Sequence, residues 1–191
     1  MTDSGPDVID ATLSHGANVL SALARNLDAH LASRGSLSEP PLDHSSARDA
    51  LTLLAWRGDC TSETLQEALE LSQPACVRVV DRLAAAGLVS RRRAPRERRL
   101  RIALTDAGAQ AAEHLVRESR ARAQGALRAA LADDEVDAFV AALDRVAAVV
   151  FGPATDTVRF CRSCDVPACL AGPAGCPSEA ACRASLRALD G

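Results

Sequence analysis

The stretch that decides the fold is residues 88–108, LVSRRRAPRERRLRIALTDAG. It carries seven arginines and, before Asp106, a single acid, Glu97. Apolar residues lead into a turn that contains proline, and they alternate with other residues from Leu100 to Leu104 on the way out. This pattern predicts a β-hairpin whose tip is covered with arginine. Because the whole chain has a net charge of −3, the hairpin is a local cationic feature rather than part of a basic protein.

Helices are predicted on both sides of this hairpin, from apolar residues at helical spacing and from capping and breaking residues at the ends. The expected helices cover residues 7–33, 46–56, 62–69, 73–86, 106–131 and 134–150. Thr61 and Thr105 are expected to cap the helices that follow them, and Gly87 to end the helix before it. The fold expected is mainly α: a winged helix-turn-helix with a small β-hairpin wing, between long N- and C-terminal dimerisation helices.

The predicted elements divide the chain into four segments. These are an N-terminal dimerisation helix and linker (residues 1–45), a winged helix-turn-helix (46–105), C-terminal dimerisation helices (106–152) and a cysteine-rich tail (153–191). The apolar stripes of the long helices are too long for one chain to cover, so a homodimer is expected.

Composition narrows the function classes. Apolar residues make up 48% of the chain and aromatic residues only 2%, which favours helices packed on helices. All 22 basic residues are arginine, whose planar fork suits phosphate and guanine. No apolar run approaches the ~20 residues that span a bilayer, and the N-terminus does not resemble a signal peptide. The sequence therefore predicts a cytoplasmic protein without a membrane partner.

Two motifs resemble the MarR family of bacterial regulators. The first is Val80-Asp81-Arg82-Leu83 followed by Gly87-Leu88-Val89, and the second is Leu104-Thr105-Asp106-Ala107-Gly108. In the wing, Glu97 stands where the family has aspartate, with Arg99 in the place of its arginine. The resemblance covers about residues 8–150. It implies a homodimeric, sequence-specific transcriptional regulator, a repressor, that binds a near-palindromic operator in double-stranded DNA.

The candidate DNA-contacting residues lie at the start of the second short helix of the motif and on the wing. Glutamine can recognise adenine and arginine can recognise guanine in the major groove, while arginines of the wing suit the minor groove and its phosphates. The full set is Ser72, Gln73, Ala75, Cys76, Arg78, Arg82, Arg96, Arg98 and Arg99. Three alternatives stay open: the arginines form a solvated face, Arg82 braces the domain with Asp81, or Cys76 faces the core.

Five of the seven cysteines fall between residues 161 and 182. Their clustering predicts a metal centre held by Cys161, Cys164, Cys169 and Cys176, with Cys182 as a spare ligand. The small apolar residues between them and the Cys176-Pro177 pair favour an iron–sulfur cluster over zinc, and a thiol switch or an unstructured tail remain alternatives. Because the tail follows the last helix, its influence on the recognition helix is expected to be indirect.

The leading hypothesis is thus a regulator whose DNA affinity responds to the cysteine centre. The alternative is a MarR-like regulator or a winged-helix docking module in which the cysteines are only a structural zinc staple. No enzyme is expected, because the sequence has no Ser/His/Asp set, phosphate loop or nucleotide motif. A small-molecule effector remains possible.

Overall fold

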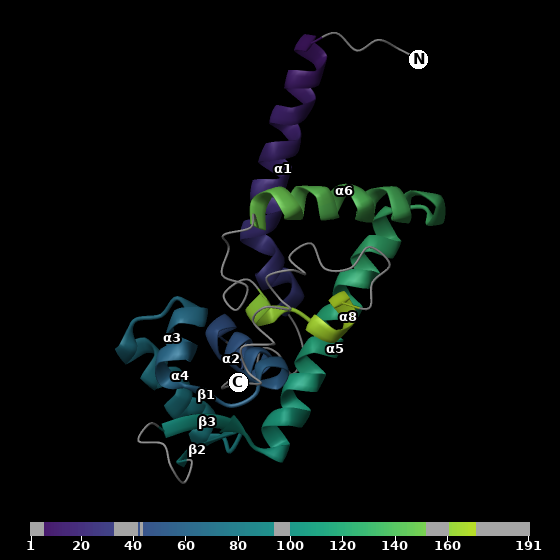
Figure 1. Cartoon of the computed structure of the whole chain (residues 1–191). Coiled ribbons are helices and arrows are strands. Elements are labelled where there is room, and N and C mark those ends of the chain that lie inside the picture. The colour runs from purple at the N-terminus through teal and green to yellow at the C-terminus, as the bar shows by residue number, and fades with distance from the viewer. Residues whose placement is uncertain (1–5, 33–41, 43, 94–99, 152–160, 171–191) are drawn as a thin grey trace.

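The computed structural model describes residues 6–32, 42, 44–93, 100–151 and 161–170. Its elements follow the predicted order, with the short strand β1 and two elements of the tail added (Figure 1). They are α1 (Pro6–Ala32), α2 (Ser45–Arg57), β1 (Cys60–Thr61), α3 (Ser62–Leu69), α4 (Gln73–Ala85), β2 (Val89–Arg93), β3 (Leu100–Leu104), α5 (Asp106–Ala130), α6 (Asp133–Phe151), the short 3-10 helix η2 (Cys161–Ser163) and α8 (Val166–Leu170).

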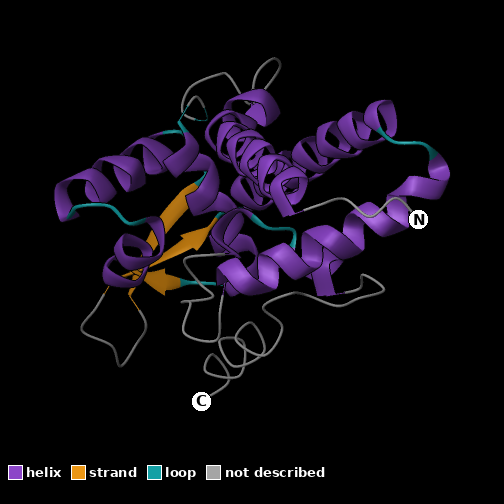
Figure 2. Cartoon of the chain, turned by 90° about the horizontal axis from the view of Figure 1, so that it is seen from above, coloured by secondary structure: helices purple, strands orange, loops and turns teal. Residues whose placement is uncertain are grey.

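The winged helix consists of α2, α3, α4 and a three-stranded antiparallel sheet in the order β1-β3-β2. The hairpin is in the register Val89↔Leu104 to Arg93↔Leu100. Figure 2 shows the sheet on one side of the molecule and the long helices on the other. The predicted mainly α winged helix-turn-helix, framed by long helices, is confirmed.

Local chemistry sets the helix ends as predicted. The Thr61 hydroxyl accepts a hydrogen bond from the Thr64 backbone N–H at 3.3 Å, which caps α3. After α4, Gly87 adopts a φ of 71°, and the Leu88 N–H donates to the Leu83 carbonyl. This left-handed residue closes the helix as glycine commonly does.

One core serves the winged helix and the first half of α5. Its fully buried side chains come from α2, α3 and α4, and the sheet and α5 close over them. The largest are Leu51, Leu53, Leu65, Leu83, Val80 and Cys76. The core therefore fixes the recognition helix α4 relative to the wing.

The outer helices keep an apolar stripe exposed in the single chain. On α1 and α6 these exposed residues include Leu13, Leu20, Leu23, Leu27, Phe139, Leu143, Val146 and Val150. Their spacing matches the stripe expected for dimerisation helices. None of the described helices is long and apolar enough to cross a membrane.

Two features were not predicted. Strand β1 has only two residues, Cys60 and Thr61, which pair with Ile102 and Arg101 of β3. In the tail, η2 and α8 lie against α2 and α5 (Figure 1). The described part of the tail is therefore docked on the winged helix rather than set apart from it.

Candidate nucleic-acid interface

Helix α4 presents one face to the core and the other to solvent. Cys76, Val79, Val80 and Leu83 form the buried face. The exposed face begins with Ser72 and Gln73 and continues through Arg78 and Arg82. A helix whose polar face projects beyond the core in this way can enter the major groove with its first residues. Ser72 is the N-cap of α4 by its backbone, although its side chain makes no capping hydrogen bond.

Cys76 does not belong to that exposed face. Its side chain is fully buried, and its thiol donates a hydrogen bond to the Ser62 backbone carbonyl with Sγ and O 3.7 Å apart. Burial also raises the pKa of this thiol above its ordinary value. The expectation that Cys76 contacts DNA is therefore wrong, because its side chain points into the core between α3 and α4. Ala75 beside it is half-buried.

The wing places its arginines in two different roles. Arg91 of β2 forms an ion pair with Asp81 of α4, which joins the wing to the recognition helix. Arg101 of β3 donates to the Asp59 backbone carbonyl at 2.8 Å. Arg92 and Arg93 are exposed on β2. Sequence reasoning missed these last two as candidate DNA contacts, although their position next to the wing tip was visible.

The tip of the wing lies outside the described residues. Arg96, Arg98 and Arg99 belong to it, so their expected contacts with DNA stay predictions. Asp81 pairs with Arg91 of the wing. Arg78 and Arg82 line a recess of about 470 Å³ together with Asp81 and with His44, which precedes α2. The recess thus holds two cationic side chains and one carboxylate of α4, and its arginines remain candidates for phosphate contacts.

The motif that ends in Gly108 is explained by a close approach between α5 and the wing. Thr105 caps α5 by accepting from the Gly108 N–H at 3.0 Å, and its hydroxyl donates to the Gly87 carbonyl at 2.6 Å. The Thr105 N–H donates to the Leu88 carbonyl at 3.1 Å. A Cβ on Gly108 would lie 1.8 Å from that same carbonyl oxygen, so only glycine fits. We call Gly87, Leu88, Thr105 and Gly108 the wing junction.

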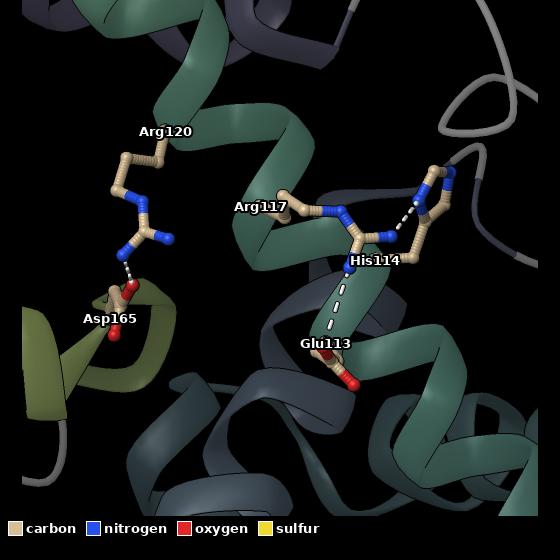
Figure 3. A network of polar contacts seen from close by, with 5 residues as sticks. All are labelled: Glu113, His114, Arg117, Arg120 and Asp165. Carbon is tan, nitrogen blue, oxygen red and sulfur yellow. Dashed lines mark hydrogen bonds and ion pairs between the residues drawn. The ribbon is translucent and has the colours of Figure 1, made fainter.

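The tail segment 161–170 docks through ion pairs and a small apolar contact. Arg162 reaches Asp49 of α2 at 3.1 Å and Glu70, at the end of α3, at 3.3 Å. Asp165 forms an ion pair with Arg120 of α5 (Figure 3). Cys161 is 4% exposed and packs with Val166 against Trp56. The described part of the tail thus contacts α2, the end of α3 and α5, and the expectation that its influence on the recognition helix is indirect stays a prediction.

The structure describes three of the four predicted metal ligands, Cys161, Cys164 and Cys169. Cys161 and Cys164 form a tight turn in which the Cys164 N–H donates to the Cys161 carbonyl at 3.0 Å. Cys164 and Cys169 are half-buried. Cys176 and Cys182 lie outside the described residues. Among the residues that are described, no group of three or more metal-binding side chains comes together.

A cavity of about 420 Å³ lies between α2, α5 and the tail segment. Its walls include Trp56 and Thr52 from α2, Val116 and Arg117 from α5, and Pro167 from α8. The indole Nε1 of Trp56 is buried and has no hydrogen-bond partner among the described residues.

With this geometry in place, comparison with known proteins identifies the domain. The model of the MarR family matches residues 47–100, which run from α2 to the first residue of β3. Over residues 47–100 the chain is similar to the MarR family. Members of that family are transcription regulators and not enzymes. No curated protein matches the chain in sequence.

Solved MarR-family structures share the fold beyond this segment. A MarR family protein from Bacillus stearothermophilus is 24% identical with a TM-score of 0.64, and the match covers 75% of this chain and 98% of that one. MepR, a transcription regulator of the Staphylococcus aureus multidrug efflux pump MepA, is 17% identical with a TM-score of 0.61 and coverages of 70% and 97%. Apo MarR from E. coli is 25% identical with a TM-score of 0.57 and coverages of 68% and 95%.

Proposed function

We propose that this chain is a homodimeric, sequence-specific DNA-binding transcriptional regulator that acts as a repressor in the cytoplasm. The observation that carries the proposal is the exposed face of α4, where Gln73 and Arg78 lie beside an arginine-rich wing joined to the same helix by the Arg91–Asp81 ion pair. Side chains at the start of such a helix contact base edges, and wing arginines contact phosphate.

The exposed stripes on α1 and α6 support the homodimer. Large apolar side chains along both helices stay in contact with water in the single chain, and burying them against a second copy would recover hydrophobic free energy. A two-fold dimer would place two α4 helices about one DNA turn apart, ~34–36 Å, and would favour a near-palindromic operator.

DNA binding in graded salt tests the proposal. The logarithm of affinity should fall steeply with the logarithm of salt concentration, because each dimer neutralises many phosphates. Arg99→Ala should weaken binding to every sequence and reduce the salt slope by about 1 for each phosphate that the arginine neutralises. Gln73→Ala and Arg78→Ala should instead reduce discrimination at particular base pairs, by ~1–3 kcal/mol each.

Arg128→Ala provides the matched control, because Arg128 is exposed in the last turn of α5, far along the helix from the wing. It should bind as the parent does. If Arg99→Ala and Gln73→Ala also bind as the parent does, the winged helix docks onto something other than DNA, and the docking-module alternative replaces this proposal.

A cysteine-ligated metal centre in the tail is the second part of the proposal, with Cys161, Cys164, Cys169 and Cys176 as ligands. An iron–sulfur cluster is preferred and zinc is the alternative. The Cys161–Cys164 turn and the apolar setting given by Val166 and Trp56 are compatible with either. Protein purified without oxygen should show broad visible absorption if a cluster is present and a colourless, zinc-containing product otherwise. A metal-free product from iron- and zinc-replete cells would contradict the centre.

The cavity between α2, α5 and the tail is the candidate site for a small-molecule effector. Its volume of about 420 Å³ falls within the usual range for such ligands. Its walls are mostly apolar, and the two arginines that line it are paired with Glu113 and Asp165, so a small, mostly apolar molecule is favoured.

A further inference from the structure

Arg162 connects α2 to the end of α3 through two ion pairs from the tail. Its Nε donates to Asp49 in α2, and its Nη1 donates to Glu70. Glu70 is the residue that ends α3, and Ser72, the N-cap of α4, follows two residues later. One guanidinium from the tail thus holds the turn of the helix-turn-helix against α2.

Glu70 is a sensitive point in that turn. Its φ of 55° lies in the left-handed region, where a residue other than glycine is held at a free-energy cost. Its backbone N–H donates to the Glu67 carbonyl. The contact with Arg162 therefore adds a tertiary restraint to a backbone conformation that local preference alone does not favour.

Two further contacts attach the same segment to α2 and α5. Asp165 pairs with Arg120 of α5 (Figure 3), and its Oδ1 also accepts from the Ala168 N–H at 3.1 Å, which begins α8. Cys161 and Val166 are buried against Trp56 of α2. The segment therefore touches α2, the α3–α4 turn and α5 at once.

We propose that residues 161–170 form a strap that holds the α3–α4 turn in place, and that Arg162 of this strap positions the recognition helix for DNA. The effect on DNA rests on the proposed function. The docked strap keeps the turn ordered before DNA binds, so less ordering has to occur on binding.

Coupling of this kind is reciprocal. If the docked strap strengthens DNA binding, then bound DNA must strengthen docking of the strap by the same factor. A released strap leaves the α3–α4 turn less restrained, so the recognition helix must be ordered when DNA binds and affinity falls.

Tryptophan fluorescence of the full chain reports the strap directly. Trp56 is the only tryptophan and the chain has no tyrosine, so all protein emission comes from the residue on which the strap packs. Arg162→Glu should break both contacts and repel Asp49 and Glu70. We expect a red shift of Trp56 emission and a loss of DNA affinity of about 5-fold or more.

The controls separate the strap from general effects of charge. Arg128→Glu makes the same change in charge on an exposed position of α5 and should leave Trp56 emission unchanged, and the change in its DNA affinity measures the effect of charge alone. Asp49→Arg added to Arg162→Glu restores one ion pair with reversed charges and should recover most of the emission shift. Circular dichroism should show that each variant keeps the helical content of the parent.

The outcomes distinguish the strap from the proposed function. If Arg162→Glu matches Arg128→Glu in emission and in DNA affinity, the strap is wrong. If Trp56 emission shifts but DNA affinity does not change, the strap docks without positioning the recognition helix, and the proposal is wrong. If the parent does not bind DNA, the proposed function fails, while the Trp56 emission of Arg162→Glu and of its rescue variant still decides whether Arg162 holds the strap in place.

Discussion

The wing junction and the strap both attach α5 to the rest of the winged helix, but they use different kinds of contact. The wing junction relies on backbone groups, with Thr105 bonded to the Gly87 and Leu88 carbonyls and Gly108 in direct contact with Leu88. The strap relies on side-chain ion pairs at the surface and on a small apolar contact with Trp56. The first attachment leaves almost no room for a change in geometry, whereas the second reaches the main core only through Trp56.

Gly108→Ala should produce the largest effect, because the new methyl group would meet the Leu88 carbonyl 1.8 Å away. Backbone must move, and we expect the free energy of unfolding to fall by about 3 kcal/mol or more. Gly125→Ala is a matched control in the same helix, since a Cβ there meets nothing within 4 Å. It should stabilise the chain by ~0.5–1 kcal/mol. Urea unfolding measures both, and equal effects would contradict the close approach at the wing junction.

Alkaline pH should test the buried thiol of β1, on the winged-helix side of the comparison. Burial raises the pKa of Cys60 to about 11, although Arg57 and Arg101 oppose the shift. The folded state favours the protonated thiol. The contribution of this thiol to the free energy of unfolding is therefore fully present below pH ~8.5 and is lost as pH rises through about 11. We expect a loss on the order of 2 kcal/mol across this window.

The chain makes this measurement unusually clean. It has no lysine and no tyrosine, so among its side chains only cysteine thiols titrate between pH 9 and 11. Cys60→Ala should remove most of the slope of stability against pH. A slope that persists in this variant would assign the alkaline sensitivity to other thiols.

Thr105→Ala should have an intermediate effect. It removes the cap of α5 and the hydrogen bond to the Gly87 carbonyl, at a cost of about 1–2 kcal/mol. Thr105→Ser keeps the hydroxyl and should cost much less. If thermal unfolding shows the two variants to be equally unstable, the methyl group of Thr105 matters more than its hydrogen bonds.

Asp165→Asn should have the smallest effect on global stability. Its ion pair with Arg120 is partly exposed, so we expect the free energy of unfolding to change by less than ~1 kcal/mol. The change should shrink further in high salt, because salt screens surface charges. A destabilisation as large as that of Thr105→Ala would place the strap in the folding core and remove the contrast between the two attachments.

Sequence reasoning succeeded where the signal was local. Thr61, Gly87 and Thr105 each act on backbone within a few residues, so their roles could be predicted from neighbours in the chain. The burial of Cys76 also had a local signal, since it stands at helical spacing from Val79, Val80 and Leu83, but its place at the helix start favoured the DNA-facing interpretation.

The strap could not be predicted in the same way. Arg162 and Asp49 are 113 residues apart, and nothing in the sequence around either residue specifies the other. Strand β1 was missed because two residues are too few to show an alternating pattern. Its pairing also depends on a distant part of the chain: β1 pairs with β3, and the hydrogen bond from Arg101 to the neighbouring Asp59 spans 42 residues. Long-range side-chain contacts of this kind depend on the packed fold.

Strand β1 has a consequence for the DNA that this domain can accept. Because β1 pairs with β3 and directly precedes α3, it connects the wing to the start of α3. The ion pair of Arg91 with Asp81 connects the wing to α4. Wing and recognition helix must then approach the duplex as one rigid body. B-DNA turns once in about 10 base pairs, so inserting a single base pair between the major-groove bases and the adjoining minor groove would rotate one relative to the other by roughly 35°. A half-site should therefore tolerate changes of base far better than changes of length.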